Sequence, residues 1–133
     1  MTARTPLEVV VLDASAMVDL LTDPSAGELI RFRLEGTAVH VPAHFDAEVF
    51  SAAGRLCRAG RLTDNDVVSI LGVVRRAPFT RHLVHNLIEG AWSRHNTHSL
   101  LDALYVELAE QLRAPLITTD RKLATSYPQA QVP

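Results

Sequence analysis

Residues 8–13 read EVVVLD, a run of four apolar residues that follows a glutamate and ends in an aspartate. A continuous apolar run of this length is typical of a strand buried on both faces, as in a parallel sheet covered by helices. Further strand-like segments occur at residues 38–41, 79–84 and 116–118, and helical segments separate them. This alternation predicts an α/β fold, a three-layer α/β/α domain around a central, mostly parallel sheet.

The helical segments have apolar residues three and four positions apart. Helices are expected over residues 14–21, 25–34, 63–76, 85–94 and 99–113, with one more long helix that Pro42 opens and that ends near Gly60. In the helix at 85–94, the residues expected to face inward are Leu87, Ile88, Ala91 and Trp92. The clearest helix, at 99–113, has an apolar stripe made of Leu101, Leu104, Tyr105, Leu108 and Leu112.

Length and composition indicate one folded domain. The chain has 133 residues, close to the ~150 of a typical domain, so a single domain over residues 1–133 is expected. Apolar residues make up 47% and charged residues 21%, which excludes a disordered chain. No apolar run approaches the ~18 residues that cross a membrane, and a short polar arm leads directly into the first strand. Neither a membrane anchor nor a signal peptide is therefore expected, and the lone, unpaired Cys57 favours a reducing cytoplasm.

The charge balance limits how the chain binds nucleic acid. Thirteen basic and fifteen acidic residues give a net charge of −2, which argues against a protein that coats nucleic acid through overall positive charge. Twelve of the bases are arginines, which suit forked contacts to phosphate, so any RNA or DNA surface is local. Three roles remain open for a set of helix arginines: contacts to phosphate, contacts to a protein partner, or a solvated helix face. These arginines are Arg55, Arg58, Arg61, Arg75 and Arg76.

Two aspartates follow strands. Asp13 ends the first strand, and Asp120 comes shortly after the strand at 116–118. Ligands of open α/β sheets gather at the carboxyl ends of the strands, so both residues are candidates for a functional site. An aspartate between a strand and a helix also serves as a helix N-cap, and this alternative stays open for each residue taken singly.

Further acids lie on helices. Asp102 falls at the border of the apolar stripe, beside Tyr105, and is expected to be half-buried. It also fits a capping box with Ser99. Asp46 and Glu48 border the apolar stripe of their helix on opposite sides, so helical geometry alone does not choose between them, and Glu48 also fits a solvated helix face.

Clustered carboxylates need compensation, because two of them 4 Å apart repel by about 4 kcal/mol at an effective dielectric constant near 20. Hard divalent cations such as Mg²⁺ prefer oxygen ligands and usually bind substrate phosphates as well. Acids from two strand ends and two helices that meet at one end of a sheet therefore predict a metal-dependent phosphodiesterase.

Several segments carry a family resemblance. Residues 96–110 read NTHSLLDALYVELAE, and residues 114–124 contain APLITTD and KLA. These segments resemble the C-terminal half of PIN-domain ribonuclease toxins of the VapC type. Residues 11–16, VLDASA, and the segment at 42–49 are similar to the first half of the same family. The resemblance covers nearly the whole chain, although residues 63–94 carry no signature.

The resemblance implies a metal-dependent endoribonuclease that binds Mg²⁺, with Mn²⁺ as a possible substitute. The implied catalytic and metal-binding acids are Asp13, Glu48, Asp102 and Asp120. The resemblance thereby selects Glu48 over Asp46. The implied supporting residues are Ser15 and Thr118, which line the site, and Asn96, which supports Asp102.

The resemblance also implies a biological role and partners. Family members are toxins of toxin–antitoxin pairs that cleave structured RNA, such as tRNA or rRNA, and so inhibit translation. A cognate antitoxin that holds the toxin inactive and a homodimer are expected on the same ground. The alternative is a noncatalytic PIN-like module that binds a protein or RNA, but the presence of all four acids disfavours it.

Other strand–aspartate proteins fit less well. An aspartyl-phosphate phosphatase needs a second aspartate at position 15, where this chain has Ser15. A phosphate-receiving signalling domain usually needs a paired acid and a lysine at the end of the sheet, and Lys122 is the only lysine. The glycine-rich motifs of nucleotide-binding loops are absent from the sequence.

Overall fold

The computed structural model describes residues 6–133, and within them the strands form one five-stranded sheet. The strands are β1 (Glu8–Leu12), β2 (Thr37–Pro42), β3 (Thr80–His82), β4 (Leu116–Ile117) and β5 (Ala130–Gln131). Their order across the sheet is β3-β2-β1-β4-β5, and every neighbouring pair is parallel. β1 therefore lies in the centre, as expected for its continuous apolar run.

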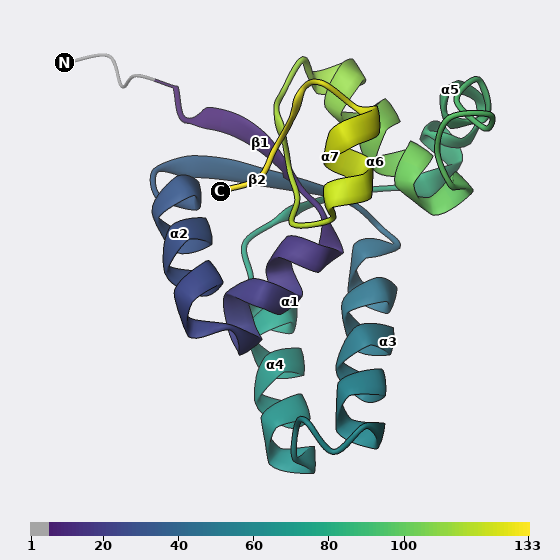
Figure 1. Cartoon of the computed structure of the whole chain (residues 1–133). Coiled ribbons are helices and arrows are strands. Elements are labelled where there is room, and N and C mark those ends of the chain that lie inside the picture. The colour runs from purple at the N-terminus through teal and green to yellow at the C-terminus, as the bar shows by residue number, and fades with distance from the viewer. Residues whose placement is uncertain (1–5) are drawn as a thin grey trace, which may run out of the picture.

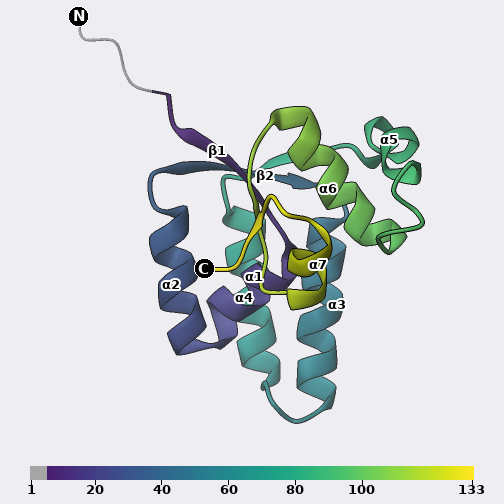
Figure 2. The ribbon, with the colours of Figure 1, turned by 45° about the horizontal axis from the view of Figure 1, so that its top comes forward.

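Helices cover both faces of this sheet. They are α1 (Ala14–Thr22), α2 (Pro24–Leu34), α3 (Phe45–Arg58), α4 (Asp64–Arg76), α5 (Ile88–Trp92), α6 (Leu100–Leu112) and α7 (Arg121–Ser126), with a short 3₁₀ turn at Val84–Asn86. In Figure 1, α1 to α4 lie on one side of the sheet and α5 and α6 on the other. Figure 2 shows α3 and α4 side by side, joined by a short loop. The three-layer α/β/α prediction is confirmed.

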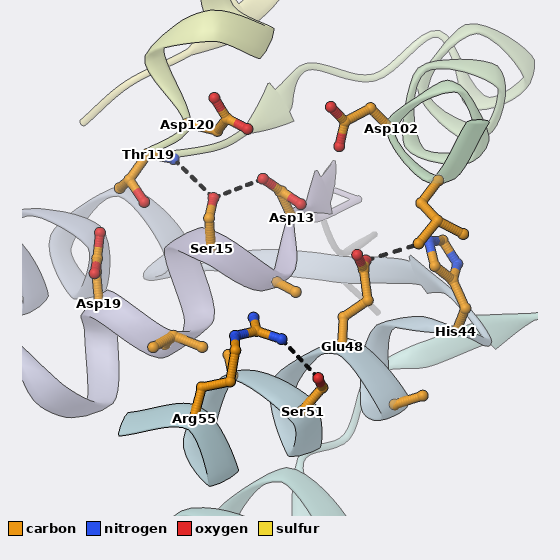
Figure 3. Close-up of a pocket in the computed structure, with 15 residues that line it drawn as sticks. Asp13, Ser15, Asp19, His44, Glu48, Ser51, Arg55, Asp102, Thr119 and Asp120 are labelled. Atoms are coloured by element: carbon orange, nitrogen blue, oxygen red, sulfur yellow. Dashed lines mark hydrogen bonds and ion pairs between the residues drawn. The ribbon is translucent and has the colours of Figure 1, made fainter. Parts of the chain in front are cut away.

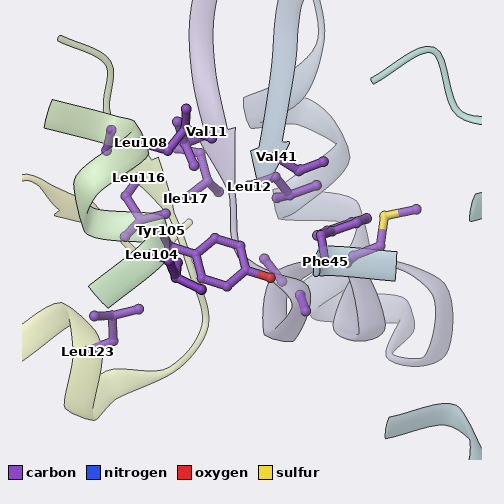
Figure 4. Close-up of a cluster of buried hydrophobic side chains, with 14 of the residues drawn as sticks. Val11, Leu12, Val41, Phe45, Leu104, Tyr105, Leu108, Leu116, Ile117 and Leu123 are labelled. Atoms are coloured by element: carbon purple, nitrogen blue, oxygen red, sulfur yellow. The ribbon is translucent and has the colours of Figure 1, made fainter. Parts of the chain in front are cut away.

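The core forms where α6 packs on the central strands. Val10, Val11 and Leu12 of β1 have no exposed surface, and neither has Tyr105 of α6 (Figure 4). Burying a side chain of the size of valine or leucine contributes about 1.5–3 kcal/mol. This burial fixes α6, and with it the residues of its first turn, against the carboxyl end of β1.

Local differences from the sequence-based expectation have simple causes. Pro42 does not open a helix: it is the last residue of β2, where its fixed φ suits extended backbone, and α3 begins at Phe45. Ile88 and Trp92 were expected to face inward but are 51% and 59% exposed. The five-residue α5 covers α6 with one side only, and both residues lie about 100° round from the inward-facing positions.

Two more expectations are corrected or fall outside the described chain. Leu101 is 52% exposed rather than part of the buried stripe, because the first turn of α6 reaches past the sheet to the rim of a pocket. The two-residue strand β5 has no counterpart among the predicted strands.

The polar arm predicted before β1 lies mostly in residues 1–5, outside the described residues. Within residues 6–133, no helix combines the length and apolar character that a membrane span requires.

Candidate active site

Two adjacent strand ends form one side of an acidic pocket. Leu12 of β1 lies opposite Ile117 of β4, so the chain leaves both strands at the same edge. The chain that leaves β1 crosses to β2 on one side, whereas the chain that leaves β4 crosses to β5 on the opposite side. The ends of β1 and β4 therefore form a switch point, the place where open α/β sheets bind ligands. The pocket has a volume of about 780 Å³, and its acidic lining residues are Asp13, Asp19, Glu48, Asp102 and Asp120 (Figure 3).

Asp13 is a buried carboxylate, only 5% exposed. Its Oδ2 accepts hydrogen bonds from Ser15 Oγ at 2.6 Å and from Thr118 Oγ1 at 2.7 Å. Asp13 occupies the N-cap position of α1, but its side chain makes no capping hydrogen bond, so the N-cap interpretation is wrong here. No donor in residues 6–133 bonds to Oδ1, which leaves that oxygen available to a ligand.

Ser15 lines the pocket as expected, whereas Thr118 is fully buried and does not line it. The hydroxyls of these two residues nevertheless link the strand ends to each other. Ser15 Oγ and Thr118 Oγ1 are 3.2 Å apart. The backbone N–H of Thr119 donates to Ser15 Oγ, and that of Asp120 donates to Thr118 Oγ1, at 3.3 Å and 3.0 Å. One network of hydrogen bonds therefore connects the Asp13 carboxylate to the backbone that carries Asp120.

Asp120 has a divided role. Its Oδ1 accepts from the backbone N–H groups of Lys122 and Leu123, at 3.0 Å and 3.2 Å, so the N-cap interpretation is confirmed for this residue. Within residues 6–133 no hydrogen bond reaches Oδ2. One carboxylate oxygen therefore caps α7 and the other is free at the pocket.

Asp102 enters the pocket from the first turn of α6 and is half-buried, as predicted. Its backbone N–H donates to Ser99 Oγ at 3.2 Å, so Ser99 caps the helix. The return bond of a capping box, from the Ser99 backbone to the Asp102 carboxylate, does not occur, whereas Thr63 and Asp66 of α4 make both bonds. The end of α6 therefore leaves the Asp102 carboxylate available to the pocket.

Glu48, and not Asp46, lines the pocket from the first turn of α3. Its Oε1 accepts a hydrogen bond from Tyr105 Oη at 2.7 Å and lies 3.2 Å from His44 Nε2. The His44 contact has the distance of an ion pair but not the alignment of a hydrogen bond. Asp46 is instead paired with Arg81 of β3.

Tyr105, His44 and Asp19 were not singled out from the sequence as site residues. Tyr105 does belong to the buried stripe as predicted, but its hydroxyl reaches a pocket carboxylate. The available signal was chemical, because a buried tyrosine hydroxyl requires a hydrogen-bond partner. Conversely, Asn96 is exposed in a turn and does not line the pocket.

The carboxylates influence one another through space. Burial raises the pKa of Asp13, and the charges of Asp102 and Glu48 raise it further, against the hydrogen bonds from Ser15 and Thr118. Burial likewise raises the pKa of Asp102, and the charges of Asp120 and Glu48 add to the effect. Burial is the main cause of both shifts, and the smaller contribution of the neighbouring acids indicates that negative charge accumulates in the pocket.

Glu48 and Tyr105 shift in opposite directions. Burial would raise the pKa of Glu48, but contacts with His44 and Tyr105 and the charge of Arg55 lower it overall. Burial, together with the charges of Asp13 and Glu48, raises the pKa of Tyr105 far above its ordinary value of 10.0. The tyrosine hydroxyl therefore stays protonated and acts as a donor.

The donor set fits a hard divalent cation. Asp13, Glu48 and Asp120 each leave one oxygen without a described protein donor, and Arg55 is the one arginine or lysine among the lining residues. Within residues 6–133, however, no three acidic, histidine or cysteine side chains are close enough to hold one ion together. A Mg²⁺ ion bound here would therefore use one or two carboxylates and keep several waters, as is usual for this ion.

The chain thus combines a parallel α/β fold with an acidic pocket at the switch point of its sheet. In sequence, the PIN domain family matches residues 10–126. The chain is 55% identical to Ribonuclease VapC3 of Mycobacterium tuberculosis over 126 residues, which cover 94% of this chain and 92% of that protein. The chain therefore belongs to the VapC ribonucleases of the PIN domain family, and the resemblance found in its sequence is confirmed.

Solved structures share the fold at lower sequence identity. VapC20 of M. tuberculosis, described as a sarcin–ricin loop cleaving toxin, superposes with a TM-score of 0.67 at 15% identity, covering 88% of this chain and 94% of VapC20. A toxin–antitoxin complex from Klebsiella pneumoniae superposes with a TM-score of 0.65 at 17% identity, covering 92% of this chain and 96% of the matched chain. Both likenesses support the PIN fold.

Proposed function

We propose that this VapC ribonuclease is a Mg²⁺-dependent endoribonuclease toxin, with Mn²⁺ as a possible substitute. Its proposed catalytic and metal-binding acids are Asp13, Glu48, Asp102 and Asp120. The observation that carries the proposal is that these four acids line one pocket in which Arg55 is the single arginine. Burial, and to a smaller extent the negative charge of neighbouring acids, raises the pKa of Asp13 and of Asp102, so carboxylates repel one another there. A fold retains such repulsion where a bound cation relieves it.

Each residue of the pocket has its own role in this proposal. Oxygens of Asp13, Glu48 and Asp120 without a protein donor would hold the cation directly or through water, and Asp102 would complete the acidic wall. A cation bound there supplies positive charge that activates a water and offsets charge developing at phosphorus. Ser15 and Thr118 hold the Asp13 carboxylate through Oδ2, and Oδ1 has no donor among the described residues.

The proposed partners are RNA and an antitoxin. The description of VapC20 as a sarcin–ricin loop cleaving toxin supports a structured RNA, rRNA or tRNA, as substrate, whose cleavage inhibits translation. The Klebsiella complex supports a cognate antitoxin that holds the toxin inactive. We further propose a homodimer acting in the cytoplasm, where these RNAs are found.

Cleavage by the purified protein tests this proposal. The protein should cut total cellular RNA in Mg²⁺ or Mn²⁺ and stop in EDTA, and Asp13→Asn should be inactive in every buffer. Sequencing the new RNA ends would identify the substrate. Metal-independent cleavage, or equal cleavage by soluble Asp13→Asn, would overturn the proposed mechanism.

Growth provides a second readout. Expression without an antitoxin should arrest growth, and Asp13→Asn or Asp120→Asn should relieve the arrest at equal protein levels. Arrest by both soluble variants would mean that the toxicity does not come from the acidic pocket.

A further inference from the structure

Tyr105 spans from the core to the pocket. It lies in α6, one helical turn after Asp102, and its side chain has no exposed surface. Figure 4 shows its ring among the core side chains of α6 and the central strands. Its hydroxyl donates to Glu48 Oε1 on α3, 57 residues earlier, at 2.7 Å. A core residue of one helix thus contacts an acid of another.

His44 contacts the same carboxylate oxygen from a second direction. It lies one turn before Glu48 at the N-cap position of α3, and its Nε2 is 3.2 Å from Oε1. The rings of His44 and Tyr105 pack against each other, with centroids 4.8 Å apart and planes inclined by 54°. The Tyr105 hydroxyl therefore holds Oε1 by a hydrogen bond and the His44 ring lies beside the same oxygen, while no donor in residues 6–133 bonds to Oε2.

From this geometry we infer that Tyr105, assisted by His44, is a positioning residue that orients Glu48 so that its Oε2 faces the cation and the scissile phosphate. The inference rests on the proposed role of Glu48 in the active site. Because α6 carries both Asp102 and Tyr105, this one helix supplies one acid directly and sets the orientation of a second acid on α3. The hydrogen bond from Tyr105 to Glu48 and the packing of Tyr105 against His44 thus join these two helices at the pocket.

An alternative role for Tyr105 is purely structural, as the satisfied polar end of a core residue. Tyr127 provides the matched comparison, because its hydroxyl donates to Glu110 Oε1 at 2.8 Å, outside the acidic pocket. Both substitutions, Tyr105→Phe and Tyr127→Phe, remove one hydroxyl from a tyrosine–glutamate pair and keep the ring. If the role of Tyr105 is purely structural, the two substitutions should differ only in their effect on thermal stability and should affect every other measurement alike.

The test measures Mn²⁺ binding by calorimetry and RNA cleavage by the full chain. Mutation of a residue that orients a metal ligand typically lowers metal affinity or activity 10–100-fold. Tyr105→Phe should therefore weaken Mn²⁺ binding and lower kcat by roughly 10-fold or more, with KM for RNA little changed. Tyr127→Phe should stay within about twofold of the parent in both measurements.

A double-mutant cycle separates positioning from folding. If Tyr105 acts through Glu48, Tyr105→Phe should have no further effect on Mn²⁺ affinity in a Glu48→Gln background. Should Tyr105→Phe fail to fold, His44→Asn carries the same cycle, since the His44 side chain makes no capping hydrogen bond that the substitution would remove. His44→Asn should weaken Mn²⁺ binding in the parent and not in Glu48→Gln.

The outcomes distinguish this inference from the proposed function. Normal Mn²⁺ binding and cleavage by folded Tyr105→Phe would overturn the positioning role and leave the nuclease proposal intact. The same holds for equal losses in the parent and Glu48→Gln backgrounds. Failure of the parent itself to bind Mn²⁺ or to cleave RNA would instead overturn the proposed function.

Discussion

Arg81 of β3 holds Asp46 of α3 in a two-point ion pair, with Nε 2.7 Å from Oδ2 and Nη2 2.9 Å from Oδ1. Arg81 Nη2 also donates to the backbone carbonyl of Val74 at 2.9 Å, so the pair ties β3 and α3 to the end of α4. Asp46 is thereby committed to a structural contact, while Glu48, two residues later, lines the pocket.

This division predicts opposite effects of two neighbouring substitutions. Glu48→Gln should lower metal-dependent RNA cleavage by about 10-fold or more, since mutation of residues around a metal typically costs 10–100-fold in activity. Asp46→Asn should leave cleavage unchanged and reduce the free energy of unfolding by about 1 kcal/mol or less, because the pair is partly exposed. Cleavage rates and urea unfolding of both variants check this, and an inactive but folded Asp46→Asn would contradict it.

Why the sequence left Asp46 and Glu48 undecided is clear from this pair. Both border the apolar stripe of one helix, and the residue that separates their roles, Arg81, comes 35 residues after Asp46. Local periodicity holds no information about such a partner. The resemblance to a known family selected Glu48, whereas helical spacing did not.

The central part of the fold was predictable for the opposite reason. EVVVL at β1 is a continuous apolar run, and the stripe of α6 repeats at helical spacing over 13 residues, so the burial of most of their apolar residues follows from the local sequence. The two-residue β5 and the outward turn of Trp92 depend instead on neighbours distant in sequence. Likewise, a buried tyrosine is easily predicted, but the carboxylate that accepts its hydrogen bond is not.

The hydroxyl of Thr118 should matter for stability. Thr118→Val keeps the shape of the side chain but removes a donor to the buried Asp13 carboxylate, which costs about 1–3 kcal/mol of unfolding free energy. Thr125→Val is the control, because its exposed hydroxyl bonds only to the Arg121 carbonyl and its loss should change little. Urea unfolding in EDTA measures both, and equal effects would argue against a special contact at Asp13.

Arg55 should contribute to RNA binding. Its Nη1 donates to Ser51 Oγ at 2.7 Å, which holds the guanidinium at the pocket, whereas Arg58 lies outside the lining. Arg55→Gln should raise KM for RNA several-fold and reduce the slope of log affinity against log salt by about 0.7–1, as for one lost phosphate contact. Arg58→Gln should do neither. Identical salt slopes for both variants would assign Arg55 to a solvated helix face.

Stability should depend on pH with opposite signs in the two metal states. The pKa values of Asp13 and Asp102 are raised above the ordinary 3.8, mainly by burial, so folding favours their protonated forms. In EDTA, their contribution to stability is therefore present at low pH and is lost as pH rises through the raised pKa values. Cation binding needs the ionised forms, so Mn²⁺ should stabilise less as pH falls through the same window.

Melting temperatures with Mn²⁺ and with EDTA, taken across this pH range, measure the effect. The gap between the two curves should close toward acid pH, starting above the ordinary range of an aspartate. Asp13→Asn should show a smaller gap that depends less on pH. A parent gap that stays constant with pH would exclude these two carboxylates as the groups that compete with protons for the cation.

The last prediction concerns Asp102, for which a helix-capping role and a metal-site role give different stabilities. Ser99 Oγ accepts from the backbone N–H of Asp102, and Asp102→Asn keeps that N–H, so the cap survives the substitution. Ser99→Ala removes the cap instead and should cost about 0.5–2 kcal/mol with or without metal. In EDTA, Asp102→Asn should melt at or above the parent temperature, because it removes repulsion from Asp120 and Glu48.

Mg²⁺ should reverse this order. A ligand that binds only the folded state stabilises it by about 2.7 kcal/mol at a hundredfold excess over Kd, so the parent should gain stability. Asp102→Asn, which lacks one carboxylate, should gain much less at the same Mg²⁺ concentration, whereas Ser99→Ala should gain as much as the parent. Equal gains for Asp102→Asn and the parent would remove Asp102 from the metal site, and its raised pKa would then reflect burial and neighbouring charge alone.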